Sequence, residues 1–398
     1  MPRKILSMAL CATSIATAPE AQYTENTEFI PCEELCEPQY WKETDSNLIL
    51  QRVRKLSHFR RDFADPGLNP LLLAAAYGET EVLQALIDQG HDSALSTNNS
   101  IAPIHKAAKN GRFKNVEILL ENGASANARN LNRNTPLHLA CSADSLETVK
   151  VLLNSGANVQ ARNDYGSSPI HFAAANASQE VLDELFRAGA SISDRNSEGY
   201  TPLHRAAAYN DEDIVQHLIG LGASLHVRTV HGDSVLHEAA KSGGSENIRT
   251  LIAKGAKPNI KNTEGETPIH DAARFNNIDS LAALAEGGAL IDIRGKGSRT
   301  PLLLSAASRF GSVDSVNYLL HLGANPDAKD KNGNTALHLS VLPWSADTEA
   351  KILALLEAGA NASAVNNDGE KPIDIARRNR KLLGTTTFWQ LNDHSFQR

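Results

Sequence analysis

Seven of the fourteen histidines in this sequence stand at one position of a recurring tetrapeptide, of which residues 135–138 (Thr-Pro-Leu-His) are an example. An imidazole can ligate a transition metal or carry a proton, but a metal site needs several ligands that converge on one point. Histidines that recur once per sequence unit are instead spaced along a row. We therefore predict no metal site and a structural role, in which each imidazole bridges backbone groups of adjacent loops. These loop histidines are His105, His138, His171, His204, His237, His270 and His338.

The known motifs of catalysis and cofactor binding are missing from the sequence. It contains no Walker or dinucleotide-binding glycine pattern, no G-x-S-x-G, no H-E-x-x-H and no C-x-x-C pair. Cys141 follows apolar residues in a predicted packed helix, where we expect a buried small hydrophobe. Cys32 and Cys36 lie in a short acidic segment without two further metal ligands, so we expect free thiols there. The sequence predicts a protein that is not an enzyme and needs no cofactor.

The composition disfavours two further classes of protein. The 398 residues are 41% hydrophobic and 21% charged, with a formal net charge of −7. Because no run approaches the roughly 18 consecutive apolar residues of a membrane-spanning helix, we predict no integral membrane span. A mildly acidic chain also lacks the positive footprint of a nucleic-acid-binding protein, so we expect no nucleic-acid partner.

The tetrapeptide returns with a fixed period. Its first residue recurs at steps of 33 from Asn69 to Thr300, then after 35 at Thr335 and after 36 at Lys371, which gives ten units. A glycine follows 21 residues after the start of each of the first seven units, and after 23 and 24 residues in units eight and nine. The extra residues of those two units therefore fall between the two markers, as local loop insertions.

Each unit has the pattern of two helices joined by a turn. A Ser or Thr suited to the N-cap precedes a Pro at the first helical position, and a following Ala-Ala pair lets a neighbouring helix approach closely. The next segment carries apolar residues at i, i+3 and i+4, as in Val116, Leu119 and Leu120, and ends at the marker glycine. One helix pair cannot bury its apolar face alone, so the sequence predicts an all-α stack of units.

The period of 33 residues, the Thr-Pro-Leu-His tetrapeptide, the Ala-Ala pair and the Gly-Ala-[Ser/Asn] that follows the second helix at 123–125 and 156–158 resemble the ankyrin repeat. The resemblance covers residues 65–383 as an array of ten repeats, whose atypical first and last tetrapeptides fit capping units. It implies an ankyrin-repeat solenoid, a curved array of helix-turn-helix-loop units. It also implies that the concave face, made of loop tips and first helices, recognises other proteins and supplies no catalytic group.

Positions on that implied concave face are free of the repeat template, so their residue types report on a partner. Aromatic residues and arginines, which dominate interface hot spots, collect there from unit four onward and on the two insertions. We predict that one or more proteins bind at Tyr165, Tyr200, Arg205, Tyr209, His231, Arg274, Phe275, Arg299, Arg309, Phe310 and Trp344.

Three segments flank the predicted array. Residues 1–45 predict a disordered acidic tail, residues 46–64 a basic amphipathic helix that caps the first repeat, and residues 384–398 a C-terminal tail. The first residues also resemble a weak secretion signal with cleavage before Pro19. We expect a cytoplasmic and/or nuclear protein, with secretion as the lesser alternative.

These observations predict a non-catalytic protein–protein interaction scaffold or adaptor, expected to be monomeric, whose partner binds the concave face. Two alternatives stay open at this point. One is a substrate-recruiting adaptor of a ubiquitin-ligase-type complex, with residues 30–63 as the docking element. The other is an exported effector that acts on a host or neighbouring-cell protein.

Overall fold

The computed structural model describes residues 48–49, 70–94, 96, 100–209, 212–309 and 312–396. Within these ranges the chain consists of α-helices and loops, with one 3-10 turn, η2 (Lys296–Ser298), and no β-strand. Every helix in these ranges falls short of the length and hydrophobicity that crossing a bilayer requires. The predicted tail 1–45, nearly all of the predicted helix 46–64, and Phe310 lie outside the described residues.

In the described part of the chain, a short first helix opens each of ten units. In unit three, Thr135 has an extended backbone as the N-cap and Pro136 is the first helical residue. Proline fits this position because its missing N–H would have had no helical acceptor. The first helices are α4 (Pro70–Tyr77), α6 (Pro103–Lys109), α8 (Pro136–Ser142), α10 (Pro169–Asn176), α12 (Pro202–Tyr209), α14 (Val235–Ser242), α16 (Pro268–Arg274), α18 (Pro301–Ala307), α20 (Ala336–Ser340) and α22 (Pro372–Ala376).

The second helix of each unit is amphipathic. In unit two, Val116 and Leu119 are fully buried while Glu117 is exposed. The chain leaves this helix through Gly123 at φ +90°, a left-handed conformation that glycine adopts without strain. The second helices are α5 (Thr80–Asp88), α7 (Phe113–Glu121), α9 (Leu146–Asn154), α11 (Gln179–Arg187), α13 (Glu212–Gly220), α15 (Ser245–Ala253), α17 (Ile278–Glu286), α19 (Val313–His321), α21 (Thr348–Glu357) and α23 (Thr386–His394).

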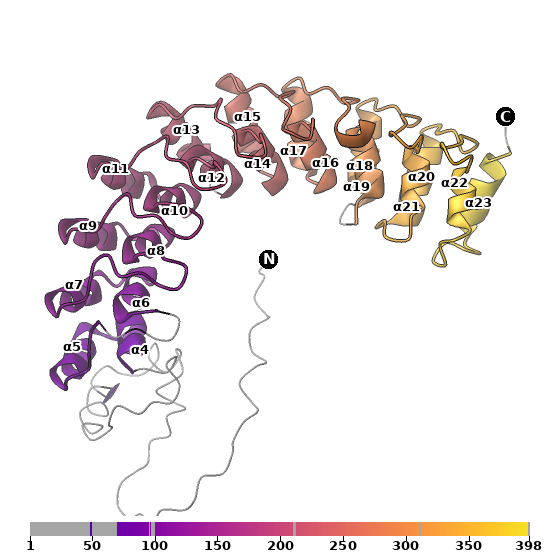
Figure 1. Cartoon of the computed structure of the whole chain (residues 1–398). Coiled ribbons are helices and arrows are strands. Elements are labelled where there is room, and N and C mark those ends of the chain that lie inside the picture. The colour runs from indigo at the N-terminus through magenta and orange to yellow at the C-terminus, as the bar shows by residue number, and fades with distance from the viewer. Residues whose placement is uncertain are drawn as a thin grey trace, which may run out of the picture.

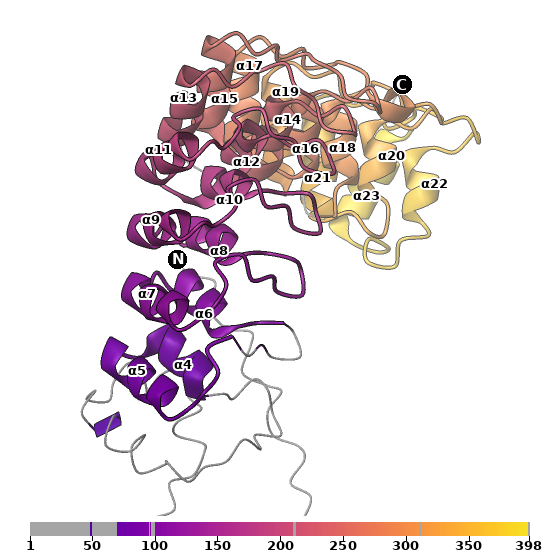
Figure 2. The same cartoon turned by 60° about the vertical axis from the view of Figure 1, so that its left-hand side comes forward.

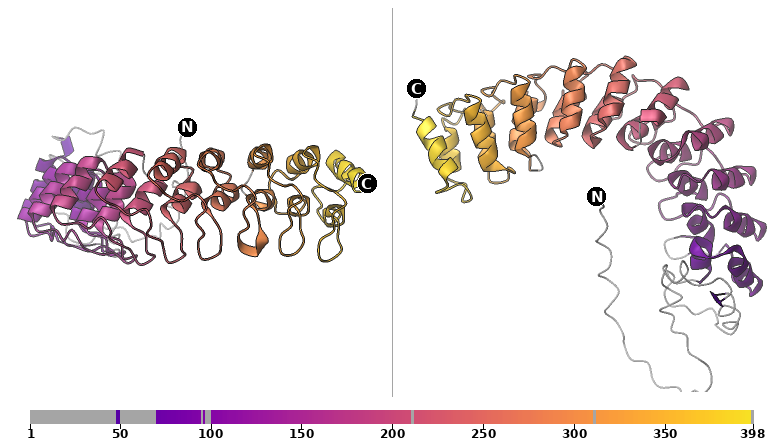
Figure 3. Two further views of the ribbon diagram at one scale, coloured as in Figure 1. Left: turned by 90° about the horizontal axis from the view of Figure 1, so that it is seen from above. Right: turned by 180° about the vertical axis from the view of Figure 1, so that it is seen from behind.

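The helices form two layers along one arc (Figure 1). First helices pack against first helices of the neighbouring units along the whole array. In units one to seven, where Figures 1 and 2 show the layers most clearly, first helices line the inner side of the arc and second helices form the outer side. The alanine pairs, such as Ala206 and Ala207, are fully buried, and their small size allows successive first helices to approach closely. The loop before each first helix, called a finger below, projects to one common side (Figure 3). The predicted all-α solenoid is confirmed.

Histidine side chains tie each unit to the next. Nδ1 of His138 accepts the backbone N–H of the N-cap Thr135 at 3.1 Å, and its Nε2 donates to the carbonyl oxygen of Ser167 in the following finger at 3.1 Å. The same pair of contacts recurs at His105, His171, His237, His270 and His338. His204 keeps the Nδ1 contact, but its buried Nε2 has no hydrogen-bond partner among the described residues. Unit eight carries Leu303 at this position.

The fingers are held by a second recurring group. In the finger of unit four, Oδ1 of Asn163 accepts the backbone N–H groups of Tyr165 and Ser167, both at 3.0 Å, and so closes the turn. Asn130, Asn196, Asn262, Asp330 and Asn366 do the same in their own fingers. Backbone hydrogen bonds also run from finger to finger, for example from Ser197 N to Tyr165 O at 3.0 Å.

The insertion of unit nine packs against the end of α18 in unit eight. In unit nine, Ser345 Oγ donates to Ala306 O at 2.9 Å and Ala346 N donates to Ser308 O at 3.1 Å, where the first helix of unit eight ends. The fully buried Lys351 donates its Nζ to the same Ser308 carbonyl at 3.3 Å. Burial lowers the pKa of Lys351 to about 8. These contacts fix the unit-nine insertion on the preceding unit.

The end of the chain differs from the predicted tail. Residues 386–394 form α23, which packs on α22 and α21 as the second helix of unit ten. Leu391 is fully buried there and Phe388 nearly so. The array therefore extends past the predicted boundary at 383. The repeat pattern missed this helix because it carries aromatic and polar residues in place of the usual Val-x-x-Leu-Leu spacing.

Acidification should destabilise the array through its histidines. Burial lowers the pKa of His138, His204 and His237 to about 4, and lowers those of the other four loop histidines. The unfolded chain therefore binds more protons than the folded one between about pH 6.5 and pH 4, and the free energy of unfolding falls as pH falls through that window. Each imidazole contributes up to about 1.4 kcal/mol per pH unit.

Urea midpoints measured across this window check the expectation. His138→Leu, which copies unit eight, should be less stable at pH 7 but should lose stability less steeply on acidification. If the urea midpoint falls equally steeply with pH in the variant and in the wild type, the low pKa of His138 in the folded protein is contradicted.

Removal of the Leu391 side chain should weaken the last unit. Leu391→Ala is expected to cost about 2–5 kcal/mol locally because it opens a cavity between α23 and its neighbours. Gln390→Ala, one residue away on the exposed side, should change stability by less than about 0.5 kcal/mol. Urea unfolding followed by circular dichroism distinguishes the two; equal small effects would show that α23 is not part of the array.

Candidate partner-binding surface

A band of charged side chains crosses the first helices of units five to seven. Its residues stand at three positions of the repeat: directly before the N-cap, four residues after the N-cap and seven residues after the N-cap. Where other units place Leu139, Phe172 or Leu304, these units place Arg205, Glu238 and Asp271. Because first helices line the inner side of the arc, this band lies on the concave layer.

Unit five contributes an aromatic and cationic cluster. The guanidinium of Arg205 lies 4.9 Å from the ring centre of Tyr200 and 5.9 Å from that of Tyr209, within the range of cation–π attraction. The Tyr200 hydroxyl reaches Glu238 Oε1 of unit six at 3.4 Å. Burial, together with the charge of Glu238, raises the pKa of Tyr200 to about 12. Three of the predicted residues therefore form one surface.

Unit six contributes a lysine between two buried carboxylates. Lys241 Nζ lies 2.6 Å from Asp233 Oδ2 and 2.9 Å from Glu238 Oε1. Burial alone would lower the pKa of Lys241, but the charge of Glu238 and the hydrogen bonds to both carboxylates raise it above its usual range. Burial alone would likewise raise the pKa of Asp233, but hydrogen bonds from Lys241 and Asn262 lower it. Asp233 is thereby held ionised.

Unit seven repeats this arrangement with an arginine. Arg274 contacts Glu266 Oε1 at 2.5 Å and Asp271 Oδ1 at 3.2 Å. Asp271 is buried, and its Oδ2 has no hydrogen-bond partner among the described residues. Burial raises the pKa of Asp271 to about 7, despite the opposing charges of Lys241 and Arg274. The charge of this carboxyl therefore changes near neutral pH.

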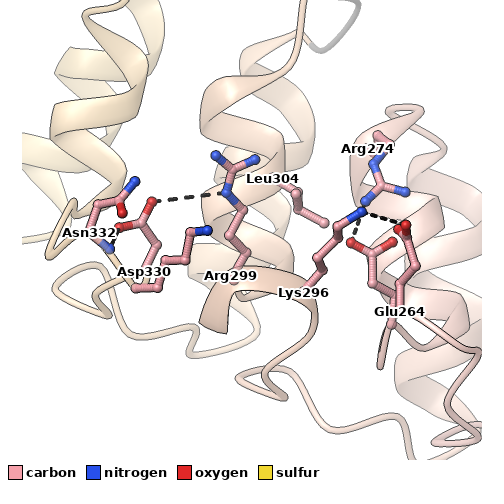
Figure 4. A pocket seen from close by; sticks show the side chains of 10 residues that line it. Glu264, Arg274, Lys296, Arg299, Leu304, Asp330 and Asn332 are labelled. Carbon is pink, nitrogen blue, oxygen red and sulfur yellow. Dashed lines mark hydrogen bonds and ion pairs between the residues drawn. The ribbon is translucent and has the colours of Figure 1, made fainter.

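A pocket of about 410 Å³ opens where the fingers of units seven, eight and nine meet α16 and α18 (Figure 4). Arg299 Nε lies 4.0 Å from Asp330 Oδ2, and Lys296 Nζ lies 2.5 Å from Glu264 Oε1. The pocket is lined by Glu264, Glu266, Arg274, Lys296, Gly297, Arg299, Leu304, Asp330, Lys331 and Asn332.

A glycine shapes this pocket. The finger of unit eight has Gly295 where most other fingers carry Asn or Asp, because a Cβ there would lie 2.8 Å from His270 Nε2 and 3.0 Å from Glu266 Cγ. Without the side-chain acceptor, this finger closes through the 3-10 turn η2, with Gly297 at φ +66°. The turn carries Lys296 to the pocket rim.

Other predicted residues lie apart from the pocket. Tyr165 and His231 are exposed on the fingers of units four and six, where their carbonyl oxygens accept hydrogen bonds from the next finger. Tyr209 is the last residue of α12, and Phe275 directly follows α16. Trp344 lies on the unit-nine insertion, four residues past the end of α20, and Arg309 lies on the unit-eight insertion. The structure therefore divides the predicted set between the finger side and the opposite edge of the concave face.

One cluster has the composition of a metal site. The ligand atoms of Asp233, His237 and Asp271 lie within 4.8 Å of one another. However, both ring nitrogens of His237 are engaged with Ser234 and with the Glu266 carbonyl. The ammonium of Lys241 already neutralises Asp233, so the cluster functions as an ion-pair network.

Sequence reasoning missed a row of cations along the fingers. Each donates a side-chain hydrogen bond of 2.5–3.3 Å to a backbone carbonyl of the next finger, mostly that of the equivalent residue. The recurrence of a basic residue at the 33-residue step of the repeat was the sequence signal that could have revealed this row. The row comprises Arg129, Arg162, Arg195, Arg228, Lys261, Arg294 and Lys329. Asp233 and Glu266 were also missed, because they stand in the polar stretch before the tetrapeptide.

Comparison with known proteins agrees with this geometry. A family model described as ankyrin repeats (3 copies) matches residues 46–130, 71–163, 104–196, 160–229, 203–295, 236–330 and 303–384. The chain belongs to the ankyrin-repeat family. The crystal structure of the human ASB11 ankyrin repeat domain is similar to it, with 32% identity, 56% of this chain and 99% of that domain covered, and a TM-score of 0.50. A search of curated protein sequences gave no significant match.

Membership of the ankyrin-repeat family defines the general role of the chain. Ankyrin repeats are protein–protein interaction modules and are typically non-catalytic. The predicted class of protein partner is supported at this level.

The two kinds of ion pair should differ sharply in their energetic importance. Lys241→Met leaves Asp233 and Glu238 buried without their cation and should cost about 1–3 kcal/mol, somewhat less than for a fully buried pair because Lys241 is partly exposed. Lys296→Met breaks only an exposed pair with Glu264 and should cost less than about 1 kcal/mol. Thermal and urea unfolding of the two variants test this difference, and similar losses would contradict the structural role of the Lys241 network.

Proposed function

We propose that this protein is a non-catalytic scaffold or adaptor that binds a protein partner on the concave face of units four to nine. We expect it to act as a monomer in the cytoplasm or nucleus. The family supports the general role, and the residues of the concave face support the location of the site.

The observation that carries the proposal is a set of large aromatic side chains left uncovered along the inner layer. Tyr209, Phe275 and Trp344 are 66%, 46% and 51% exposed. They belong to units five, seven and nine. Tyr209 and Phe275 occupy the same repeat position at the ends of their first helices, and Trp344 lies on the insertion that follows α20. The buried core is built mainly of Ala, Val, Leu and Ile, and Tyr209, Phe275 and Trp344 do not belong to it or pack against it. Exposed aromatic residues of this kind are typical anchors of interfaces.

The rigidity of the array favours this use. Stacked helices, loop histidines and finger-to-finger hydrogen bonds fix the backbone that carries these side chains. A surface that is ordered before binding loses little conformational entropy when the partner arrives. The charged band around Arg205, Lys241 and Arg274 adds a polar component, which selects partners by charge.

The test combines three substitutions, Tyr209→Ala, Phe275→Ala and Trp344→Ala, in the full chain. Affinity purification of the tagged chain with mass spectrometry should identify partners that the wild type retains and the triple variant loses. For a purified partner we expect at least a hundredfold loss of affinity, about 2.7 kcal/mol, because hot-spot truncations commonly cost this much.

The matched control removes three exposed apolar side chains that lie directly after α13 or in unit ten, away from the first helices of units four to nine: Leu221→Ala, Leu383→Ala and Trp389→Ala. It should retain the partners. If both triple variants bind as the wild type does, the concave site is wrong.

A further inference from the structure

We infer that the pocket between the fingers of units seven, eight and nine binds the carboxylate of one Asp or Glu side chain in a linear segment of the partner protein. This inference rests on the proposed function and adds the chemistry of the bound segment.

The charges that line the pocket are arranged by depth. Its carboxylates at Glu266 and Asp330 have side chains only 3% and 1% exposed. The cations Lys296 and Arg299 have side chains 65% and 41% exposed, and Lys331 is also exposed. A ligand that approaches the pocket therefore contacts positively charged side chains at the surface, while most of the negatively charged side chains are buried beneath them.

The cations differ in how much binding capacity remains. Arg274 is committed to Glu266 and Asp271 and fixes the pocket wall. Arg299 lies 4.0 Å from Asp330, beyond hydrogen-bond distance, so its guanidinium donors stay available.

Two lysines complete the open side. Lys331 makes no ion pair among the described residues. Lys296 pairs with Glu264 in an exposed contact, which costs little to rearrange. Arg299 and Lys331 are thus the main ligand-binding groups, and Lys296 assists.

The charge balance favours a carboxylate over a phosphate. The lining holds four cations, Arg274, Lys296, Arg299 and Lys331, and three anions, Glu264, Glu266 and Asp330. One singly charged group completes this balance, whereas a phosphate of charge near −2 would add repulsion from the carboxylates. Leu304 supplies an apolar contact for the aliphatic part of an Asp or Glu side chain. The volume of about 410 Å³ suits one side chain and its neighbours.

The experiment uses the full chain and a phage-displayed library of random linear peptides as the probe. Selected peptides should share an Asp or Glu. When synthesised, they should lose at least about tenfold in affinity when that residue becomes Asn or Gln, or when the protein carries Arg299→Gln and Lys331→Gln. Both substituted residues are at least partly exposed, and the melting temperature of the variant confirms that it folds.

The control variant Arg187→Gln/Arg249→Gln removes the same charge from the outer helices α11 and α15 and should bind as the wild type does. Peptides are compared as free acids and as C-terminal amides. Equal binding supports a side-chain carboxylate, while binding that requires the free terminus overturns the inference.

The remaining outcomes are also decisive. If no acidic peptide is selected, or if binding is unaffected by the Arg299/Lys331 variant, the pocket is not a carboxylate site. If, in either case, the selected peptides bind the Tyr209/Phe275/Trp344 variant more weakly than the wild type, the concave binding face stands. Only the inference on the pocket is then overturned.

Discussion

Each helix pair of this chain can bury its apolar face only against the next pair, and the rest of the structure depends on this constraint. Small residues such as Ala206 and Ala207 are completely buried between first helices because there is no space for anything larger. Stability is therefore shared between neighbours, and the first and last units need a different outer face. Unit ten meets this need with α23, whose buried Leu391 faces the array and whose Trp389 is exposed.

The same constraint separates structure from recognition. Helix caps, loop histidines and finger turns use fixed positions of the repeat, so the remaining positions on the concave layer can vary without loss of the fold. Units five to seven use that freedom for charges. Burying Asp233 or Glu266 would be costly without a cation, and Lys241 and Arg274 provide one in each unit. These networks give the concave face a defined charge pattern on a rigid support.

Most of the architecture could be predicted from the sequence, because the fold is encoded by a strict period. The helix pairs, the all-α solenoid and the loop insertions follow from the positions of Pro, Ala and Gly. The charged band could be predicted only as separate residues, since its ion pairs join side chains of different repeat positions, such as Glu266 and Arg274. The turn at Gly295 could not be predicted from the sequence either, because it is caused by the close approach of His270 from the neighbouring unit. The last helix escaped because a terminal unit has no successor and departs from the template.

The binding face that we propose spans several units, with a pocket shaped by three fingers at one edge and exposed aromatic side chains at the opposite edge. Such a face suits a partner segment that crosses the inner layer and contacts both edges. Elsewhere the chain carries isolated exposed apolar side chains such as Leu221 and Leu383, which are common on any protein surface.

We propose that the partner lies on the concave face of units four to nine. Hydrogen–deuterium exchange of the full chain, with and without a co-purified partner, tests this location. We expect protection of the first helices α10, α12, α14, α16, α18 and α20 and of the fingers of units four to nine, with exchange in the outer helices unchanged. Protection confined to the outer helices or to residues 1–64 would contradict it.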